Sequence, residues 1–125
     1  LVRDDAEPFL ARARRAGLAA RIEARRCDAD GLGLRGEFPG AFDFVLASNV
    51  LHETPDLTAT LVEIAEILRP GGLLYVMEPS FHVGAEDFTA ELDTARELGF
   101  VELERPALRR ERCVVLRRGE SGAVA

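Results

Sequence analysis

Two short, largely apolar runs enclose a periodic stretch in the middle of the chain. In the first run, Phe42, Phe44, Val45, Leu46 and Ala47 are too continuously apolar for a strand with one face in water, so we expect cover on both of its faces. The periodic stretch places four apolar side chains on one helix face, at Leu57, Leu61, Ile64 and Leu68. Arg69–Gly72 stops this helix, with glycine as its expected cap, and Leu73–Met77 predicts a second buried strand. Together these segments predict a β-α-β unit with parallel strands.

The N-terminal part of the chain carries weaker patterns. Residues 1 and 2 read as the end of a strand, so we expect an N-terminally truncated sheet. Glu7–Gly17 predicts a helix that Asp4 or Asp5 caps. Ala20–Cys27 predicts a third, weaker strand.

The C-terminal part predicts a helix followed by two strands. The helix covers Ala85–Leu98, and the strands begin at Phe100 and Cys113. Too few residues separate these strands for a helical crossover, so we expect them to pair antiparallel. The result is an α/β sheet, mostly parallel with an antiparallel last strand. We expect one partial domain over residues 1–118 and a disordered tail over residues 119–125.

Composition and charge exclude several classes of protein. The net charge of -6 argues against nucleic acid as a partner. No apolar run approaches the roughly 20 residues of a membrane helix, and no secretory signal is visible, so we expect a cytoplasmic protein without a membrane partner. All 16 basic residues are arginine, which excludes a lysine nucleophile. Cys27 and Cys113 lack the spacing of a metal site and read as apolar residues.

A literal G-x-G-x-x-G occurs at Gly31, Gly33 and Gly36. Dinucleotide binding needs such glycines between a buried strand and a helix whose N-terminus faces the pyrophosphate. Here a polar stretch precedes the glycines, and a strand follows them without room for a helix. We therefore interpret them as an ordinary connection, and an NAD-binding Rossmann protein is the less favoured interpretation of the chain.

Polar side chains follow each predicted strand, at the edge where open α/β sheets bind ligands. They are Asp4, Asp28, Ser48, Asn49 and Glu78. Asp4 can bind two vicinal ribose hydroxyls, because its carboxylate offers two acceptor oxygens. The carboxylate of Asp28 can accept a hydrogen bond from an adenine amino group. Helix capping or solvent exposure is the alternative role for each aspartate.

Four segments, in this order, resemble the class I S-adenosylmethionine-dependent methyltransferases that act on small molecules. They are residues 4–14, Cys27–Ala29, FDFVLASNVLHETPD and ILRPGGLLYVMEP. The resemblance covers about residues 1–118 and implies a Rossmann-like methyltransferase sheet with S-adenosyl-L-methionine as cofactor. The family's first strand and glycine-rich turn should precede Asp4. Gly31–Gly36 cannot replace that turn, because it follows the family's third strand.

The resemblance also implies roles for single residues. It implies that Asp4 binds the ribose hydroxyls and that Asp28 binds the adenine amino group. Asp5 is the alternative to Asp4 for the ribose hydroxyls. Ala29 would make a backbone contact to the adenine ring. Ser48 and Asn49 would lie where the strand end approaches the amino acid end of the cofactor.

Both histidines of the chain, His52 and His82, follow adjacent strands at the presumed ligand edge. We expect them to be catalytic and to face the substrate, one as general base for an acceptor hydroxyl or thiol. Glu53 and Glu78 accompany them, and we expect these carboxylates to contact the substrate. The alternatives are structural roles for the histidines, or a metal site formed by all four residues.

Two hypotheses of function follow. In the first, the chain transfers a methyl group from S-adenosylmethionine to a small-molecule acceptor. In the second, it is a non-catalytic remnant or interaction module that keeps the sheet. A missing central strand would leave an exposed sheet edge, so we expect a homodimer through that edge.

Overall fold

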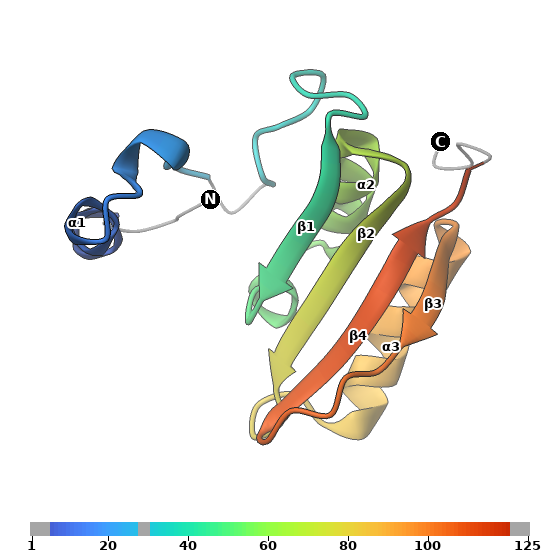
Figure 1. The fold of residues 1–125 in the computed structure, drawn as a ribbon. Coiled ribbons are helices and arrows are strands. Elements are labelled where there is room, and N and C mark those ends of the chain that lie inside the picture. Colours follow the sequence, from blue (N-terminus) through green and yellow to red (C-terminus); the bar gives the residue numbers. More distant parts are fainter. Residues whose placement is uncertain (1–5, 28–30, 121–125) are drawn as a thin grey trace.

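The computed structural model describes residues 6–27 and 31–120. Three helices and four strands follow one another along this part of the chain, with two short 3₁₀ turns, η1 and η2 (Figure 1). In chain order they are α1 (Glu7–Arg15), η1 (Ala19–Arg21), β1 (Phe42–Ser48), η2 (Leu51–Glu53), α2 (Leu57–Ile67), β2 (Leu68–Pro79), α3 (Ala85–Glu97), β3 (Phe100–Glu104) and β4 (Glu111–Arg118).

The four strands form one sheet in the order β1-β2-β4-β3. β1 and β2 are parallel, and β4 is antiparallel to both of its neighbours, which confirms the mixed α/β sheet with an antiparallel last strand. Among the described strands one pair is parallel and two are antiparallel. Ser48 pairs with Met77, so the segments that leave β1 and β2 emerge at the same edge of the sheet.

One face of the sheet is covered by α2 and α3, and the core lies between these layers (Figure 1). Its most deeply buried side chains are each at most 1% exposed: Leu61, Leu68, Leu74, Leu92 and Leu116. A fully buried leucine contributes roughly 2 kcal/mol relative to an exposed one. The periodic apolar residues that predicted α2 and α3 therefore pack together in this single core.

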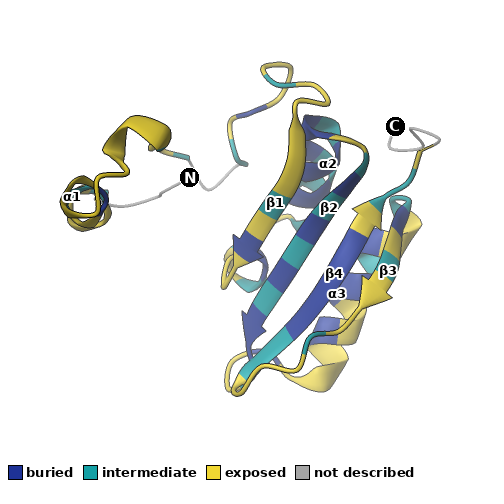
Figure 2. Cartoon of the chain, in the orientation of Figure 1, coloured by how far each residue is buried: buried dark blue, intermediate teal, exposed yellow. Residues whose placement is uncertain are grey.

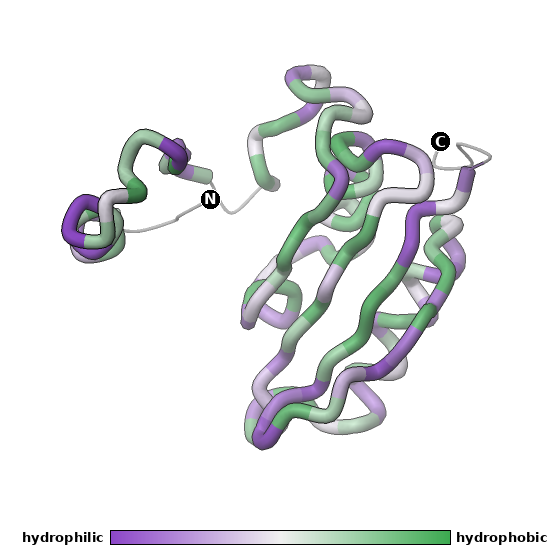
Figure 3. The backbone as a smooth tube through the Cα atoms, viewed as in Figure 1, coloured by the Kyte–Doolittle hydropathy of each residue, from purple (hydrophilic) through white to green (hydrophobic). Residues whose placement is uncertain are grey.

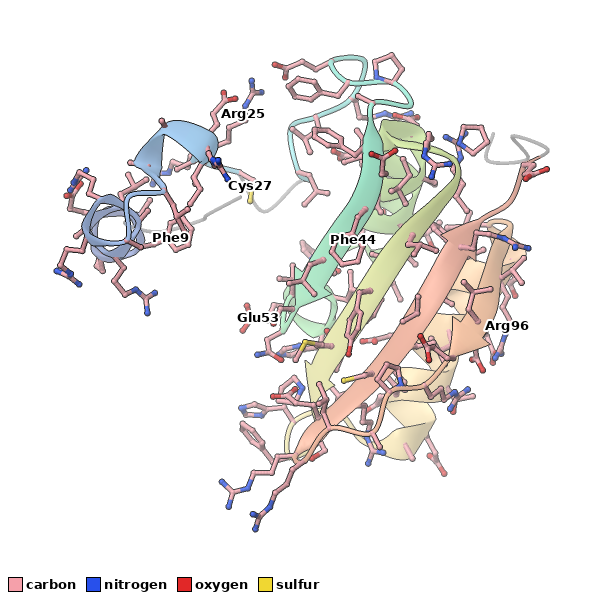
Figure 4. All side chains as sticks on the ribbon, in the orientation of Figure 1. Phe9, Arg25, Cys27, Phe44, Glu53 and Arg96 are labelled. Carbon is pink, nitrogen blue, oxygen red and sulfur yellow. The ribbon has the colours of Figure 1, made fainter. Side chains whose placement is uncertain are left out.

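No described helix lies on the opposite face of the sheet, and β1 is largely exposed, whereas β2 and β4 are mostly intermediate or buried (Figure 2). Phe44 and Leu46 of β1 are 51% and 54% exposed, and Figure 4 shows Phe44 standing on this face. The expected cover on both faces of β1 is therefore wrong for the described residues. The reason is that the described helices packed on the sheet lie on one side only, although the strands are hydrophobic along most of their length (Figure 3).

The expected strand over Ala20–Cys27 is also wrong. The chain forms η1 and then shows only a single bridge residue, Arg26, which belongs to none of the four strands of the sheet. Its apolar residues, Ile22, Ala24 and Cys27, are too few and too small to hold a strand on a core. Figure 1 shows α1 and η1 standing apart from the sheet. The strand end at residues 1–2 and the capping role of Asp4 or Asp5 lie outside the described residues.

The glycines after α2 have a different role from the one expected. The helix is terminated by Leu68, which is already extended (ψ 137°) and begins β2, so the predicted glycine cap is wrong. Gly71 has φ 80° and lies where β2 gains residues relative to β1, between the Phe42–Leu68 and Phe44–Leu73 pairs. Glycine is needed here for a bulge, because other residues adopt this φ at a cost.

The predicted tail is partly attached to the domain. The Gly119 N–H donates to the Gly99 carbonyl at 3.1 Å, so the chain stays tied to the sheet beyond residue 118. The remainder of the expected tail, residues 121–125, lies outside the described residues.

Candidate functional site

A histidine and a buried glutamate meet at the carboxyl edge of the parallel strands. His52 lies in η2, directly after β1, and Glu78 is the penultimate residue of β2. The His52 Nδ1 atom is 2.6 Å from Glu78 Oε2, and the Leu51 N–H donates to Glu78 Oε1 at 3.2 Å. The parallel register brings these residues together, since Ser48 already lies beside Met77. Both carboxylate oxygens of Glu78 therefore contact residues of η2.

Burial sets the electrostatics of this pair. The Glu78 side chain is 0% exposed, whereas that of His52 is 21% exposed. Burial raises the pKa of Glu78, and the nearby His52 opposes this rise by favouring the ionised carboxylate. With Nδ1–H donated to the carboxylate, Nε2 of a neutral His52 carries the free lone pair. The pair can therefore accept a proton at Nε2.

Other side chains surround the outer side of His52. Glu53 Oε1 lies 3.8 Å from His52 Nε2, and Figure 4 shows Glu53 near the end of β1. The rings of His52 and His82 are nearly parallel, with centroids 6.1 Å apart and an interplanar angle of 19°. Phe81 in turn contacts His82, at 4.6 Å between ring centroids. The two histidines expected at this edge thus share one site.

The loop that carries Phe81 and His82 is fixed by β4 and the turn before it. Arg112 Nε donates to the Val83 carbonyl at 2.8 Å. The Ser80 N–H donates to the Arg110 carbonyl at 3.0 Å. Sequence reasoning missed both arginines, because the contacts depend on the antiparallel pairing of β2 with β4.

Glu91 is a further buried acid near this site that sequence reasoning missed. It lies on the inner face of α3 at 9% exposure, and its Oε2 atom has no hydrogen-bond partner in the described part of the protein. Burial, and then the charges of Glu78 and Asp87, raise the pKa of Glu91 to about 7. A signal was present in the sequence: Glu91 falls between Phe88 and Leu92 on the apolar face of α3.

The structure corrects one of the expected substrate contacts. Glu78 has no exposed surface, and a fully covered carboxylate cannot touch a substrate. Glu78 instead lies on the buried side of His52, next to its Nδ1 atom. Glu53, by contrast, has a 60% exposed side chain at the same edge.

The expected cofactor residues are only partly described. Ser48 and Asn49 are exposed at the end of β1, and Asn49 adopts φ 57° while its N–H donates to the Met77 carbonyl at 2.8 Å. The backbone thus turns sharply where the amino acid end of a cofactor was expected. Asp4, Asp28 and Ala29 lie outside the described residues.

The G-x-G-x-x-G segment is used as a structural connection. It leads through turns to β1, and no helix follows it. The carboxylate of Glu63 on α2 accepts from the N–H groups of Leu32 and Leu34, at 3.3 Å and 3.4 Å. These backbone donors therefore bind a side chain of the same protein, as expected for an ordinary connection.

Within residues 6–27 and 31–120, no three His, Cys, Asp or Glu side chains converge in a way that could hold a metal ion. In the same ranges, no helix has the length and apolar character needed to cross a membrane.

Comparison with known proteins places the chain in a family. A family profile described as a methyltransferase domain matches residues 2–76. The polyketide synthase component of lovastatin nonaketide synthase, from Aspergillus terreus, is 40% identical over 57 residues, which are 46% of this chain and 2% of that protein. The chain thus spans about 1–2% of the length of the curated relatives that it matches.

Solved structures show the same fold. The trans-methyltransferase CalH, solved in complex with SAH, is 26% identical with a TM-score of 0.64, over 92% of this chain and 41% of that one. The CurJ carbon methyltransferase is 19% identical with a TM-score of 0.60, over 89% of this chain and 39% of that one. The matched profile covers more than half of the chain, and the sheet agrees with these folds. The chain therefore belongs to the class I methyltransferases, whose cofactor is S-adenosylmethionine.

Proposed function

We propose that this chain takes part in methyl transfer from S-adenosylmethionine to an acidic carbon of a small acceptor, with His52 as general base. The observation that carries the proposal is the 2.6 Å contact between His52 Nδ1 and the fully buried Glu78. A buried carboxylate that fixes one imidazole nitrogen leaves the other free to accept a proton. The polyketide synthases among the relatives support a carbon acceptor, since their products are carbon chains.

The chemistry explains why a histidine base suits this acceptor. When bound, the cofactor supplies an electrophilic methyl group, so the protein has to activate and align the acceptor. Imidazole is a weak base, and it removes a proton efficiently only where the resulting anion is stabilised. A carbon between two carbonyl groups meets that condition far better than an ordinary hydroxyl. A thiol acceptor, also consistent with the site, lacks the support of the relatives.

Each described residue then has a task. His52 Nε2 takes the proton, and Glu78 and Glu53 stabilise the imidazolium that forms, the latter from 3.8 Å. His82 stacks on the outer side of the base, and Phe81 packs against His82. Ser48 and Asn49 would hold the amino acid end of the cofactor, as the family resemblance implies.

The remaining cofactor contacts belong to residues outside the described ranges. Asp4 would bind the ribose hydroxyls, Asp28 the adenine amino group, and Ala29 the ring through its backbone.

The experiment measures cofactor binding and methylation separately. Calorimetry with S-adenosylmethionine tests binding, and mass spectrometry follows a deuterated methyl group into the acetoacetyl thioester of N-acetylcysteamine. We expect Glu78→Gln and His52→Ala to lower the rate by about 10²–10⁴-fold with unchanged cofactor affinity. Glutamine presents an amide N–H to Nδ1 and so forces the proton onto Nε2, where it blocks the base.

Three results decide between the hypotheses. No cofactor binding in the millimolar range would overturn catalysis by these 125 residues. Cofactor binding with a wild-type rate in Glu78→Gln would overturn the role of the His52–Glu78 pair. Cofactor binding without methylation would support the second candidate, a non-catalytic module. One observation favours that candidate: the glycine-rich segment among the described residues is bound to Glu63.

A further inference from the structure

The turn before β4 holds an arginine in a conformation that normally belongs to glycine. The Glu111 N–H donates to the Leu108 carbonyl at 3.3 Å, which closes a tight turn with Arg109 and Arg110 at its centre. Arg110 has φ 66°. A side chain with a Cβ atom adopts this left-handed conformation at an energetic cost, and such strain is concentrated at functional sites.

This turn lies directly against the candidate site. The Ser80 N–H donates to the Arg110 carbonyl at 3.0 Å, and Pro79 pairs with Glu111 in the sheet. The next two residues after Ser80 are Phe81 and His82; the His82 ring stacks against His52, and the Phe81 ring contacts His82. Figure 1 shows the loops before β4 and after β2 at the same end of the molecule as the exit of β1. The strained arginine is therefore at the rim of the site.

The two arginines of the turn form no ion pair with the described residues, although the chain is acidic overall. Six other arginines are paired with carboxylates: Arg14, Arg25, Arg35, Arg69, Arg96 and Arg105. Arg109 and Arg110 are both exposed. Leu108 and Phe81 are 46% and 77% exposed beside them. The rim thus combines two exposed guanidinium groups that have no ion pair among the described residues with two exposed apolar side chains.

We propose that Arg109 and Arg110 bind a phosphate group on the tail of the acceptor. Guanidinium groups bind phosphate through paired N–H donors, and two neighbouring groups suit its multiple charge. The loop with Phe81 and His82 separates the turn from His52, so the phosphate must be joined to the reacting carbon by a linker. The exposed side chains of Phe81 and Leu108 offer apolar contact for such a linker. This inference rests on the proposed function and assigns the acceptor a phosphate-bearing tail.

The experiment compares three thioesters that share the acetoacetyl group. The N-acetylcysteamine thioester is neutral, the dephospho-coenzyme A thioester carries a pyrophosphate, and the coenzyme A thioester adds a ribose phosphate. Calorimetry measures the binding of each to the full chain, so the readout does not depend on methylation. We expect at least one phosphate-bearing thioester to bind about tenfold or more tightly than the neutral one. The comparison between the two coenzyme A forms identifies which phosphate is bound.

Variants connect this preference to the turn. Arg109→Gln/Arg110→Gln should abolish the preference and leave binding of the neutral thioester unchanged. Arg12→Gln/Arg15→Gln removes the same charge from exposed positions on α1 and should retain the preference. Arg110→Gly should reduce the preference and raise the melting temperature, because glycine relieves the left-handed strain.

Failure of this inference is distinct from failure of the proposed function. Equal binding of all three thioesters would overturn the phosphate site, even if the neutral one is methylated. An equal loss of preference in the α1 control would also overturn it, because the effect would then be one of overall charge. A preference that depends on Arg109 and Arg110 would support the site, even in a chain that methylates none of the thioesters.

Discussion

At the scale of single residues, the site contains two buried acids, Glu78 and Glu91, that differ in protonation state. Glu78 is paired with His52 and has both oxygens hydrogen-bonded, which favours its ionised form. Glu91 lacks a partner for Oε2 among the described residues, and the charge of Glu78 acts on it. Two neighbouring carboxylates are costly to ionise together, so the unpaired one retains its proton. Glu91 is therefore largely neutral below about pH 7.

This state of Glu91 predicts a pH dependence of stability. Its pKa is raised from 4.5 to about 7 in the folded protein, so the folded state binds this proton more tightly than the unfolded chain. The resulting stabilisation is complete below pH 4.5 and is lost as the pH rises towards 7. The loss amounts to about 3 kcal/mol in the free energy of unfolding. Urea unfolding across this range measures it.

Glu91→Gln should remove this dependence. The variant should match the wild type near the acidic end and exceed its stability by about 3 kcal/mol at about pH 8. Glu97→Gln on the exposed side of α3 is the control and should keep the wild-type slope. Parallel stability curves for wild type and Glu91→Gln would contradict the prediction.

At the scale of elements, α2 and α3 differ in how their first turns are capped. Asp56 precedes α2 and accepts from the Ala59 N–H at 3.0 Å. Gly84 precedes α3 and provides no side-chain cap. α2 follows η2 closely along the chain, so its start also defines the position of the segment that carries His52.

We predict that Asp56→Ala lowers the free energy of unfolding by about 1 kcal/mol, because the Ala59 N–H loses its acceptor. Asp56→Ser keeps a side-chain acceptor and should restore most of this stability. Chemical unfolding of the three proteins at one pH measures both effects. An equal loss in the alanine and serine variants would show that capping is not the cause.

Most elements could be predicted from the sequence because they bury periodic apolar faces in one core. The ends of α2 and α3 were predicted within one residue for this reason. The strand expected over Ala20–Cys27 failed because its few apolar residues have no core to join. The pairing of His52 with Glu78 was not predictable in detail, since it depends on the register of two strands. The sequence placed both residues at one edge but could not show that Glu78 is covered.

At the scale of the whole molecule, the two edges of the sheet are built differently. β3 is short, carries Glu102 and Glu104, and has a register irregularity between them. Glu102 also pairs with Arg96 and Arg105. Charges, shortness and irregularity are the usual protection of an edge strand against pairing with another chain.

β1, at the other edge, has little of this protection. Its sequence, FDFVLAS, contains one charged residue, Asp43, which is paired with Arg69 at 2.6 Å. Phe44 and Leu46 are about half exposed. Its outer backbone groups have no partner strand in the described sheet. A strand with these properties favours pairing with a second strand.

We therefore propose that two copies of the chain associate through their β1 strands, as expected for an open edge. In an antiparallel pair centred on Val45, Phe44 faces Leu46 of the second copy and Asp43 faces Ala47, so no like charges oppose each other.

Leu46→Lys should weaken the dimer by about tenfold or more, because two added charges then approach the shared edge. Leu103→Lys places the same charge on β3, where the residue is 47% exposed, and should leave association unchanged. Sedimentation velocity over a range of concentrations measures both effects. A wild-type chain that stays monomeric throughout, or equal weakening by the two lysines, would show that β1 is not the interface.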